Sequence, residues 1–73
     1  VYENYLKRLG EQYPLLNTND KKLCAYLKMD LSSKDIAPLL NMSVRSVETA
    51  RYRLRKKLGL SRDANLTEFL QRF

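Results

Sequence analysis

Residues 31–58 read LSSKDIAPLLNMSVRSVETARYRLRKKL, and this stretch decides the fold. Ser32 or Ser33 is a typical N-cap, and helical spacing of the apolar residues that follow predicts a helix from about this point. A tight turn comes next, and Ser43 caps a second helix that runs to about Leu58. The stretch therefore predicts two helices joined by a short turn, and the second helix is strongly basic.

Apolar residues mark the faces on which these two helices are expected to pack together. In the first helix they are Ile36, Ala37, Leu39 and Leu40, and in the second they are Val47, Ala50, Leu54 and Leu58. Both sets recur at intervals of three or four residues, as a buried helical stripe does. Met42 in the turn is expected to fill the elbow. Pro38 is tolerated in a first turn, but if Ser33 or Lys34 is the cap it lies slightly late for that position, and the first helix would then be somewhat distorted.

Three further helices are predicted outside this stretch. One covers residues 2–12 and ends before Pro14, which disfavours helical geometry at the preceding residue. A second begins after Asn17, which has capping-box spacing to Asp20, and a third follows Asn65, which has the same spacing to Glu68. The apolar face of this last helix is Leu66, Phe69, Leu70 and Phe73. The sequence predicts one all-α domain over residues 1–73: a small bundle of four core helices, plus an N-terminal helical extension over residues 1–15.

Composition narrows the possible functions. The chain has 73 residues and a net charge of +6, which favours a polyanionic partner. Its one cysteine, Cys24, lies in an apolar run and is expected to be a small buried residue, so no intramolecular disulfide is possible. There is no histidine, nucleophile motif or phosphate-loop glycine pattern, so we expect no enzyme activity, no metal and no cofactor. The chain does not begin with methionine, and we expect it to be a fragment of a longer protein.

Basic residues are concentrated in the second helix of the opening stretch. Between residues 45 and 57 they are Arg45, Arg51, Arg53, Arg55, Lys56 and Lys57, against one acidic residue, Glu48. Two helices joined by a tight turn can place the second helix in a DNA major groove, where its first half meets base edges. With the apolar stripe turned inward, the expected base contacts are Arg45, Glu48, Thr49 and Tyr52. The expected phosphate contacts are Arg53, Lys56 and Lys57, with Ser32 and Lys34 at the start of the bracing helix.

Other interpretations of these charges remain open. A basic run at a helix end also complements the helix dipole, which would explain Lys56 and Lys57 without a partner. Arg51 could form a salt bridge with Asp35 or Glu48. Glu48 itself would face a polyanion, so it is either a specificity residue for cytosine or a partner of a neighbouring side chain on its own helix.

The order and spacing of several short motifs resemble the LuxR/GerE-type helix-turn-helix domain over about residues 17–70. The matching residues are Leu31–Ala37, Leu40, Ser43, Ser46–Glu48 and Lys57–Leu60. The resemblance implies a cytoplasmic bacterial transcription regulator, often dimeric on double-stranded DNA. It places groove-facing positions at Glu48, Thr49 and Tyr52, and phosphate positions at Lys34, Ser46 and Lys57. The chain departs from the family pattern at Asp30, where glycine is usual, and at Glu48 and Ala50, where Lys and His are frequent.

The resemblance also suggests partners and alternatives. An upstream sensor or receiver domain in the full-length protein is expected to control the domain, at the cytoplasmic side if that protein is a membrane receptor, with no membrane contact by the domain itself. The exposed part of the last helix is a candidate homodimer surface, although we expect at least two of its four apolar residues to close the core. Sigma-factor region 4, which would imply RNA polymerase as a partner, has a similar pattern. A protein-interaction helical bundle with an acidic partner is the other alternative.

Overall fold

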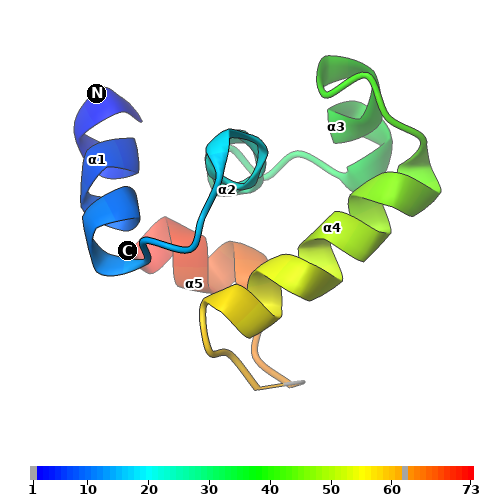
Figure 1. The fold of residues 1–73 in the computed structure, drawn as a ribbon. Coiled ribbons are helices and arrows are strands. Elements are labelled where there is room, and N and C mark those ends of the chain that lie inside the picture. Colours follow the sequence, from blue (N-terminus) through cyan, green and yellow to red (C-terminus); the bar gives the residue numbers. More distant parts are fainter. Residues whose placement is uncertain (1, 62) are drawn as a thin grey trace.

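Five α-helices make up the secondary structure of the residues that the computed structural model describes, 2–61 and 63–73 (Figure 1). They are α1 Tyr2–Gln12, α2 Thr18–Lys28, α3 Ser33–Leu39, α4 Val44–Lys57 and α5 Leu66–Arg72. The radius of gyration is 11.3 Å, close to the value of about 11 Å expected for one compact domain of this length. The prediction of a small all-α domain is therefore confirmed.

The core lies around α2, which packs against α1, α4 and α5, while α3 packs against α4 (Figure 1). Its buried side chains are Tyr5, Leu9, Leu16, Leu23, Cys24, Leu27, Ile36, Ala37, Val47, Leu54, Leu58, Leu66 and Leu70. Helix α1 contributes Tyr5 and Leu9 to this cluster. The segment expected as an N-terminal extension thus shares the core of the other four helices.

Local capping chemistry sets where the helices begin. Asn17 accepts a 2.8 Å bond from the Asp20 N–H, and the Asp20 carboxylate accepts a 3.0 Å bond from the Asn17 N–H, so the predicted capping box is formed. Ser32, and not Ser33, caps α3, and Ser43 caps α4 as predicted. Asn65 caps α5.

The box predicted at the start of α5 is only half formed. Asn65 accepts a 2.9 Å bond from the Glu68 N–H. The Glu68 carboxylate lies 2.7 Å from the Arg72 guanidinium, one turn further along the helix. An arginine at the i+4 position attracts the carboxylate away from the helix start.

Helices α2, α3 and α4 end in the same way, with a residue in the left-handed region. These residues are Asp30 (φ 64°), Asn41 (φ 57°) and Gly59 (φ 71°). In each case the next residue donates its N–H to the carbonyl five positions earlier: Leu31 to Tyr26, Met42 to Ala37, and Leu60 to Arg55. This is the Schellman motif, in which glycine is the usual left-handed residue. Glycine is absent at the first two ends, and Asp and Asn are the next best tolerated there.

The prediction that Leu39 lies in the interface between α3 and α4 is wrong. Leu39 is 54% exposed, whereas Ile36 and Ala37 are buried and Leu40 is half-buried. At 100° per residue, Leu39 lies on the solvent side of the direction shared by the other three residues. Helix α3 continues through Pro38 to Leu39, so the proline lies within the last turn of this seven-residue helix.

The N-terminal helix is held against the C-terminal one by a buried polar contact. The Tyr5 hydroxyl donates a 2.9 Å hydrogen bond to the Leu70 carbonyl, and its ring meets the Phe73 ring edge-on at 5.8 Å. The Lys28 ammonium lies 4.5 Å from the centre of the Tyr5 ring. Both chain ends therefore lie on the same side of the molecule (Figure 1).

Cys24 lies in the core with no exposed surface, as predicted. Burial, followed by the negative charge of Asp20, raises the pKa of the Cys24 thiol to about 12. A thiol with so high a pKa holds very little of the reactive thiolate at neutral pH. Across the described ranges of the chain, none of the helices combines the length and the apolar character needed to cross a membrane.

Candidate nucleic-acid interface

A hydrogen bond between α3 and α4 fixes the two helices relative to each other. The Arg51 guanidinium donates a 3.0 Å bond to the hydroxyl of Ser33, the first residue of α3. The expected partners of Arg51, Asp35 and Glu48, are replaced by this neutral hydroxyl. Because Val47 and Ile36 are also buried at this junction, α4 is held in one orientation on the rest of the domain.

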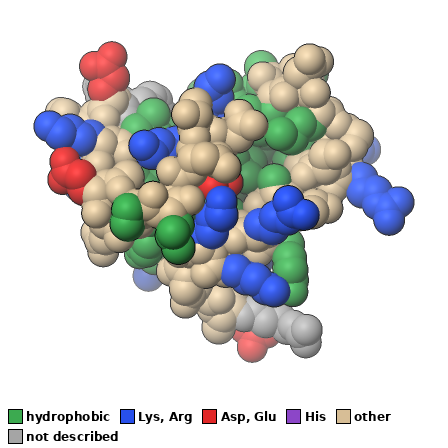
Figure 2. Space-filling view, in the orientation of Figure 1, with side chains coloured by type: hydrophobic (Ala, Val, Ile, Leu, Met, Phe, Trp, Pro, Cys, Tyr) green, Lys and Arg blue, Asp and Glu red, His purple; other side chains and the backbone are tan. Residues whose placement is uncertain are grey.

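The outward face of α4 carries the side chains that were predicted to meet bases. Arg45, Glu48, Thr49 and Tyr52 are all exposed, as are Arg53 and Lys56. Val47 and Leu54 on the opposite side have no exposed surface. Figure 2 shows Lys and Arg side chains gathered over α4. The structure therefore brings together on one exposed helix face the residues from which a base-reading surface would be built.

The hydroxyl groups in the first half of α4 bond within the helix. The Ser43 hydroxyl donates a 3.0 Å bond to the Ser46 hydroxyl and accepts a 3.1 Å bond from the Ser46 N–H. The Thr49 hydroxyl donates a 3.1 Å bond to the Arg45 carbonyl one turn earlier. The hydroxyl protons of Ser43 and Thr49 are therefore already used inside the protein.

Tyr52 and Lys56 form a pair in the middle of the exposed face. Tyr52 is 60% exposed, and the Lys56 ammonium lies 4.7 Å from the centre of its ring. A cation over an aromatic face is attracted by the negative charge of the π-system. The contact holds the Lys56 charge beside Tyr52, one turn beyond Glu48 and Thr49.

Lys57, the last residue of α4, has an ionic partner on another helix of the domain. Its ammonium lies 2.5 Å from the Asp20 carboxylate, which joins the end of α4 to the start of α2. The two side chains are 31% and 12% exposed. Sequence reasoning missed this pair, since the residues are 37 positions apart and no local pattern links them. Lys57 therefore has a structural role in addition to any contact with a phosphate.

The same ion pair lies in a surface cavity of about 530 Å³ between the start of α2 and the side of α4. Its lining includes Asn19, Asp20, Arg45, Thr49, Arg53 and Lys57. Arg45 and Arg53 also line this cavity. Among the described residues, neither arginine lies as close to a carboxylate as Lys57 lies to Asp20. The hollow thus adds a concave, basic edge to the exposed face of α4.

The start of α3 offers less to a phosphate than the sequence suggested. The Ser32 N–H and hydroxyl both donate to the Asp35 carboxylate, over 3.2 and 2.9 Å. Ser32 also accepts a bond from the Asp35 N–H. The acidic side chain thus engages the donors of Ser32 and adds a negative charge at this helix end. Lys34 is exposed and remains the available cation there.

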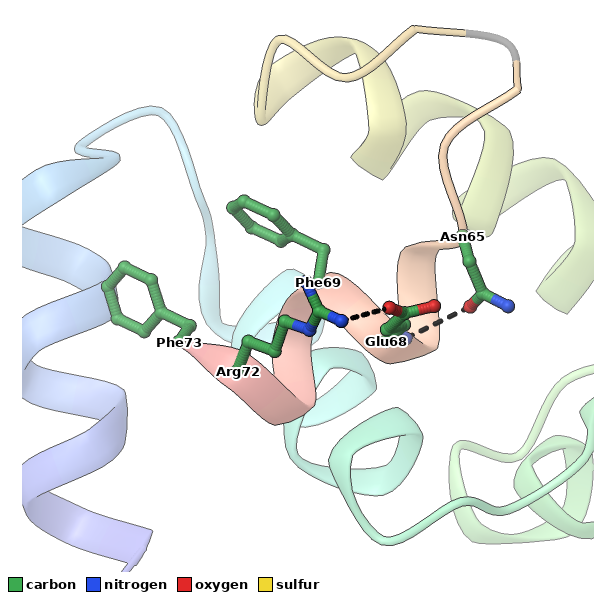
Figure 3. Close-up of a pocket in the computed structure, with 5 residues that line it drawn as sticks. All are labelled: Asn65, Glu68, Phe69, Arg72 and Phe73. Carbon is green, nitrogen blue, oxygen red and sulfur yellow. Dashed lines mark hydrogen bonds and ion pairs between the residues drawn. The ribbon is translucent and has the colours of Figure 1, made fainter.

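Helix α5 divides its apolar residues between the core and the surface. Leu66 and Leu70 are buried, so two of the four residues close the core, as expected. Phe69 and Phe73 are half-buried, and their rings lie 6.4 and 6.1 Å from that of Tyr13. Figure 3 shows the side chains of both residues projecting from the end of α5, together with the Glu68–Arg72 ion pair. A shallow pocket of about 370 Å³ lies along this side of the helix.

Comparisons of the chain with protein-family models, with curated proteins and with solved structures found no match. Function is therefore inferred from the surface chemistry of this chain. That chemistry is concentrated on α4, the longest helix in the described ranges, whose outward face is basic and exposed.

Proposed function

We propose that this chain binds double-stranded DNA and uses α3, the turn and α4 as a helix-turn-helix. In this proposal it is the output domain of a bacterial transcription regulator of the LuxR/GerE type and works in the cytoplasm. The observation that carries the proposal is the division of α4 into a buried apolar side and an exposed side. The exposed side presents Arg45, Glu48, Thr49, Tyr52, Arg53 and Lys56 together.

Base recognition is assigned to the first half of α4. A recognition helix meets base edges with its N-terminal residues, and Arg45 through Tyr52 occupy that half of the helix. Arg45 would donate to guanine O6 and N7, and Glu48 would accept from cytosine N4. The exposed ring of Tyr52 is placed to pack on a base or a sugar. This mixture of one donor, one acceptor and apolar groups suits sequence-specific recognition better than uniform attraction.

Phosphate contacts are assigned to the flanks of this face. Arg53 lines the cavity beside α2, and Lys56 is held over Tyr52 one turn further along the same exposed face. The set is completed by Lys34 at the start of α3, Ser46 in α4, and Lys57. Lys57 is also paired with Asp20. Ser32 is the weakest of the proposed contacts because its donors already bind Asp35. Such contacts orient a protein on the duplex without reading its sequence.

The charge distribution supports this docking direction. The chain has a net charge of +6, yet α4 contains one acidic residue among its 14. Three of the other acidic side chains, Glu3, Glu11 and Glu68, lie on α1 and α5. The acidic residues of α1 and α5 are balanced there by basic ones, so a polyanion approaching the domain is attracted most strongly to the α4 side.

Partners of the domain are proposed from the same arrangement. Phe69 and Phe73 form the candidate dimer surface, because their rings remain half-buried after Leu66 and Leu70 have closed the core. Two domains paired in this way would meet two half-sites about one helical turn apart. An upstream sensor or receiver domain would control the pairing, and RNA polymerase would be a further partner.

The test is duplex binding followed by selection from a random DNA pool. Purified domain is titrated against labelled duplex at low salt, and the bound sequences are then selected and read. We expect binding that selects a short motif, and we expect Arg45→Ala or Glu48→Ala to change the motif. Arg53→Ala is expected to weaken all duplexes by a similar factor, because phosphates are present in every sequence.

Other outcomes would point to the alternatives. A domain with no duplex affinity at low salt that binds an acidic protein would be an interaction bundle, and the DNA proposal would be wrong. Recovery of RNA polymerase together with promoter sequences would favour a module like sigma-factor region 4. If Glu48→Ala weakens binding to selected DNA and to random DNA by the same factor, Glu48 does not belong to the base-reading set.

A further inference from the structure

The hydrogen bonds inside α4 restrict what its first half can offer to a partner. The hydroxyl protons of Ser43 and Thr49 bind Ser46 and the Arg45 carbonyl, at 3.0 and 3.1 Å. Since a hydroxyl has only one proton, neither group can donate to a base without breaking an existing bond. The branch of Thr49 that stays free of these bonds is its methyl group.

Val44 adds a second apolar group at the same end of the helix. It is the first residue of α4, directly after the Ser43 cap, and 40% of it is exposed. Its burial is incomplete although it is a branched apolar residue, whereas Val47, one turn later, has no exposed surface. The first half of α4 therefore presents two exposed apolar groups, Val44 at its first position and the Thr49 methyl five residues later, on the two flanks of the face that carries Arg45 and Glu48.

We propose that Val44 and the methyl group of Thr49 recognise the 5-methyl groups of thymines in the DNA site. The inference rests on the proposed DNA binding and names the bases that accompany those read by Arg45 and Glu48. The thymine methyl is the one apolar group that the four base pairs display in the major groove. This methyl is therefore the group on the base edges that best complements an apolar side chain of a recognition helix.

The expected size of each contact follows from the burial of one methyl group. Burying one apolar group of this size changes the affinity by about fourfold. Two thymines in each half-site would then contribute about 16-fold to the binding of one domain, if they act independently. A site that also contains G·C pairs for Arg45 and Glu48 is predicted to be mixed in composition.

Deoxyuridine substitution tests the proposal, because it removes the methyl group of thymine and keeps its base pairing. A duplex selected by the domain is prepared with each thymine replaced in turn, and the dissociation constants are measured by fluorescence anisotropy. We expect two positions in each half-site at which the replacement weakens binding about fourfold. Replacement at the remaining thymines should leave the affinity unchanged.

Three variants assign the two positions to residues. Thr49→Ser keeps the hydroxyl and removes the methyl, so it should weaken binding to the thymine duplex about fourfold and abolish the deoxyuridine effect at one position. Thr49→Val keeps a methyl and removes the hydroxyl, so it should retain the effect. Val44→Ala shortens the apolar side chain and should reduce the effect at the other position. All three changes are at exposed residues, and a circular dichroism melt of each variant checks that it folds.

The outcomes separate this proposal from the proposed function. Selected binding without any deoxyuridine effect, or a selected site without thymine, overturns methyl recognition and leaves DNA binding intact. Retention of thymine preference by Thr49→Ser, together with its loss in Thr49→Val, would show that the hydroxyl reads the base and would also overturn it. Absence of all duplex binding at low salt would overturn both proposals.

Discussion

The Lys57 ammonium lies 2.5 Å from the Asp20 carboxylate and so joins the end of α4 to the start of α2. Asp20 has a second partner, the Asn17 N–H, which donates to the same carboxylate oxygen over 3.0 Å. One acidic side chain therefore caps α2 and holds the helix that we propose reads DNA. Removal of the Asp20 carboxylate should therefore lower the stability of the domain and also disturb the placement of α4.

Lys57→Met is expected to destabilise the domain by about 1–2 kcal/mol, because it leaves the largely buried Asp20 carboxylate without its cation. The loss stays below that of a fully buried pair, since Lys57 retains some solvent contact. Arg72→Met is the matched control, because the Glu68–Arg72 pair is 54% and 79% exposed and should contribute less than about 0.5 kcal/mol. Urea unfolding measures both variants, and equal losses would contradict the structural role of Lys57.

Asp30→Gly is expected to stabilise the domain by about 0.5–1 kcal/mol, since Asp30 has a φ of 64° and glycine adopts this conformation without strain. The effect has the opposite sign in a helix interior, where Lys22→Gly should cost about 1 kcal/mol. Thermal unfolding of the two variants compares them directly. A lower melting temperature for Asp30→Gly would show that the aspartate side chain contributes more than the left-handed backbone costs.

Tyr5→Phe tests whether α1 belongs to the core. It removes the 2.9 Å bond to the Leu70 carbonyl and leaves a buried acceptor unpaired, which should cost about 1–2 kcal/mol. Tyr52→Phe makes the same chemical change at a residue that is 60% exposed and should alter the stability by less than about 0.5 kcal/mol. If the two variants unfold at the same urea concentration, α1 is not held by this contact.

Stability should fall at alkaline pH because of Cys24. The pKa of its thiol is about 12 in the folded domain against an ordinary value of 9.0, so the unfolded chain loses this proton first. The stabilisation that comes from the buried, protonated thiol is fully present below pH 9. It is lost as the pH rises towards 12, by up to about 1.4 kcal/mol for each pH unit. Burial also raises the pKa of Tyr5, which acts in the same direction above its ordinary value of 10.0.

A Cys24→Ala variant isolates the thiol. Its free energy of unfolding should depend less on pH between 9 and 10 than that of the unchanged domain, whatever its absolute stability. The native thiol should also resist a thiol reagent at pH 8 and react only when the domain unfolds, because the residue has no exposed surface. A pH dependence that is unchanged by the substitution would assign the alkaline loss to other groups.

Much of the helical organisation could be predicted because its determinants are local. The caps at Asn17, Ser43 and Asn65 and the stop at Gly59 each act within a few residues, and short-range patterns reveal them. The exposed and buried sides of α4 followed from its period in the same way. The prediction that Leu39 is buried was wrong, because the positions of the neighbouring helices decide which side of the seven-residue helix α3 is covered.

Contacts between distant residues lay beyond sequence reasoning. The Lys57–Asp20 pair and the Tyr5–Leu70 bond join positions 37 and 65 residues apart, and only the fold brings them together. Arg51 was expected to bind a carboxylate, but the packing of α3 on α4 places the neutral Ser33 hydroxyl in its reach. Hydroxyl directions, such as that of Thr49 towards the Arg45 carbonyl, likewise depend on geometry that a sequence does not state.

Salt dependence of duplex binding, compared between two charge-matched variants, tests the central claim most directly. Arg53→Ala and Lys7→Ala each remove one positive charge from an exposed residue, but Arg53 lies on α4 and Lys7 on α1. If α4 faces the duplex, Arg53→Ala should reduce the slope of log K against log salt by about 0.9, and Lys7→Ala should leave the slope unchanged. Equal effects of the two variants, or no duplex affinity at low salt, would contradict the account.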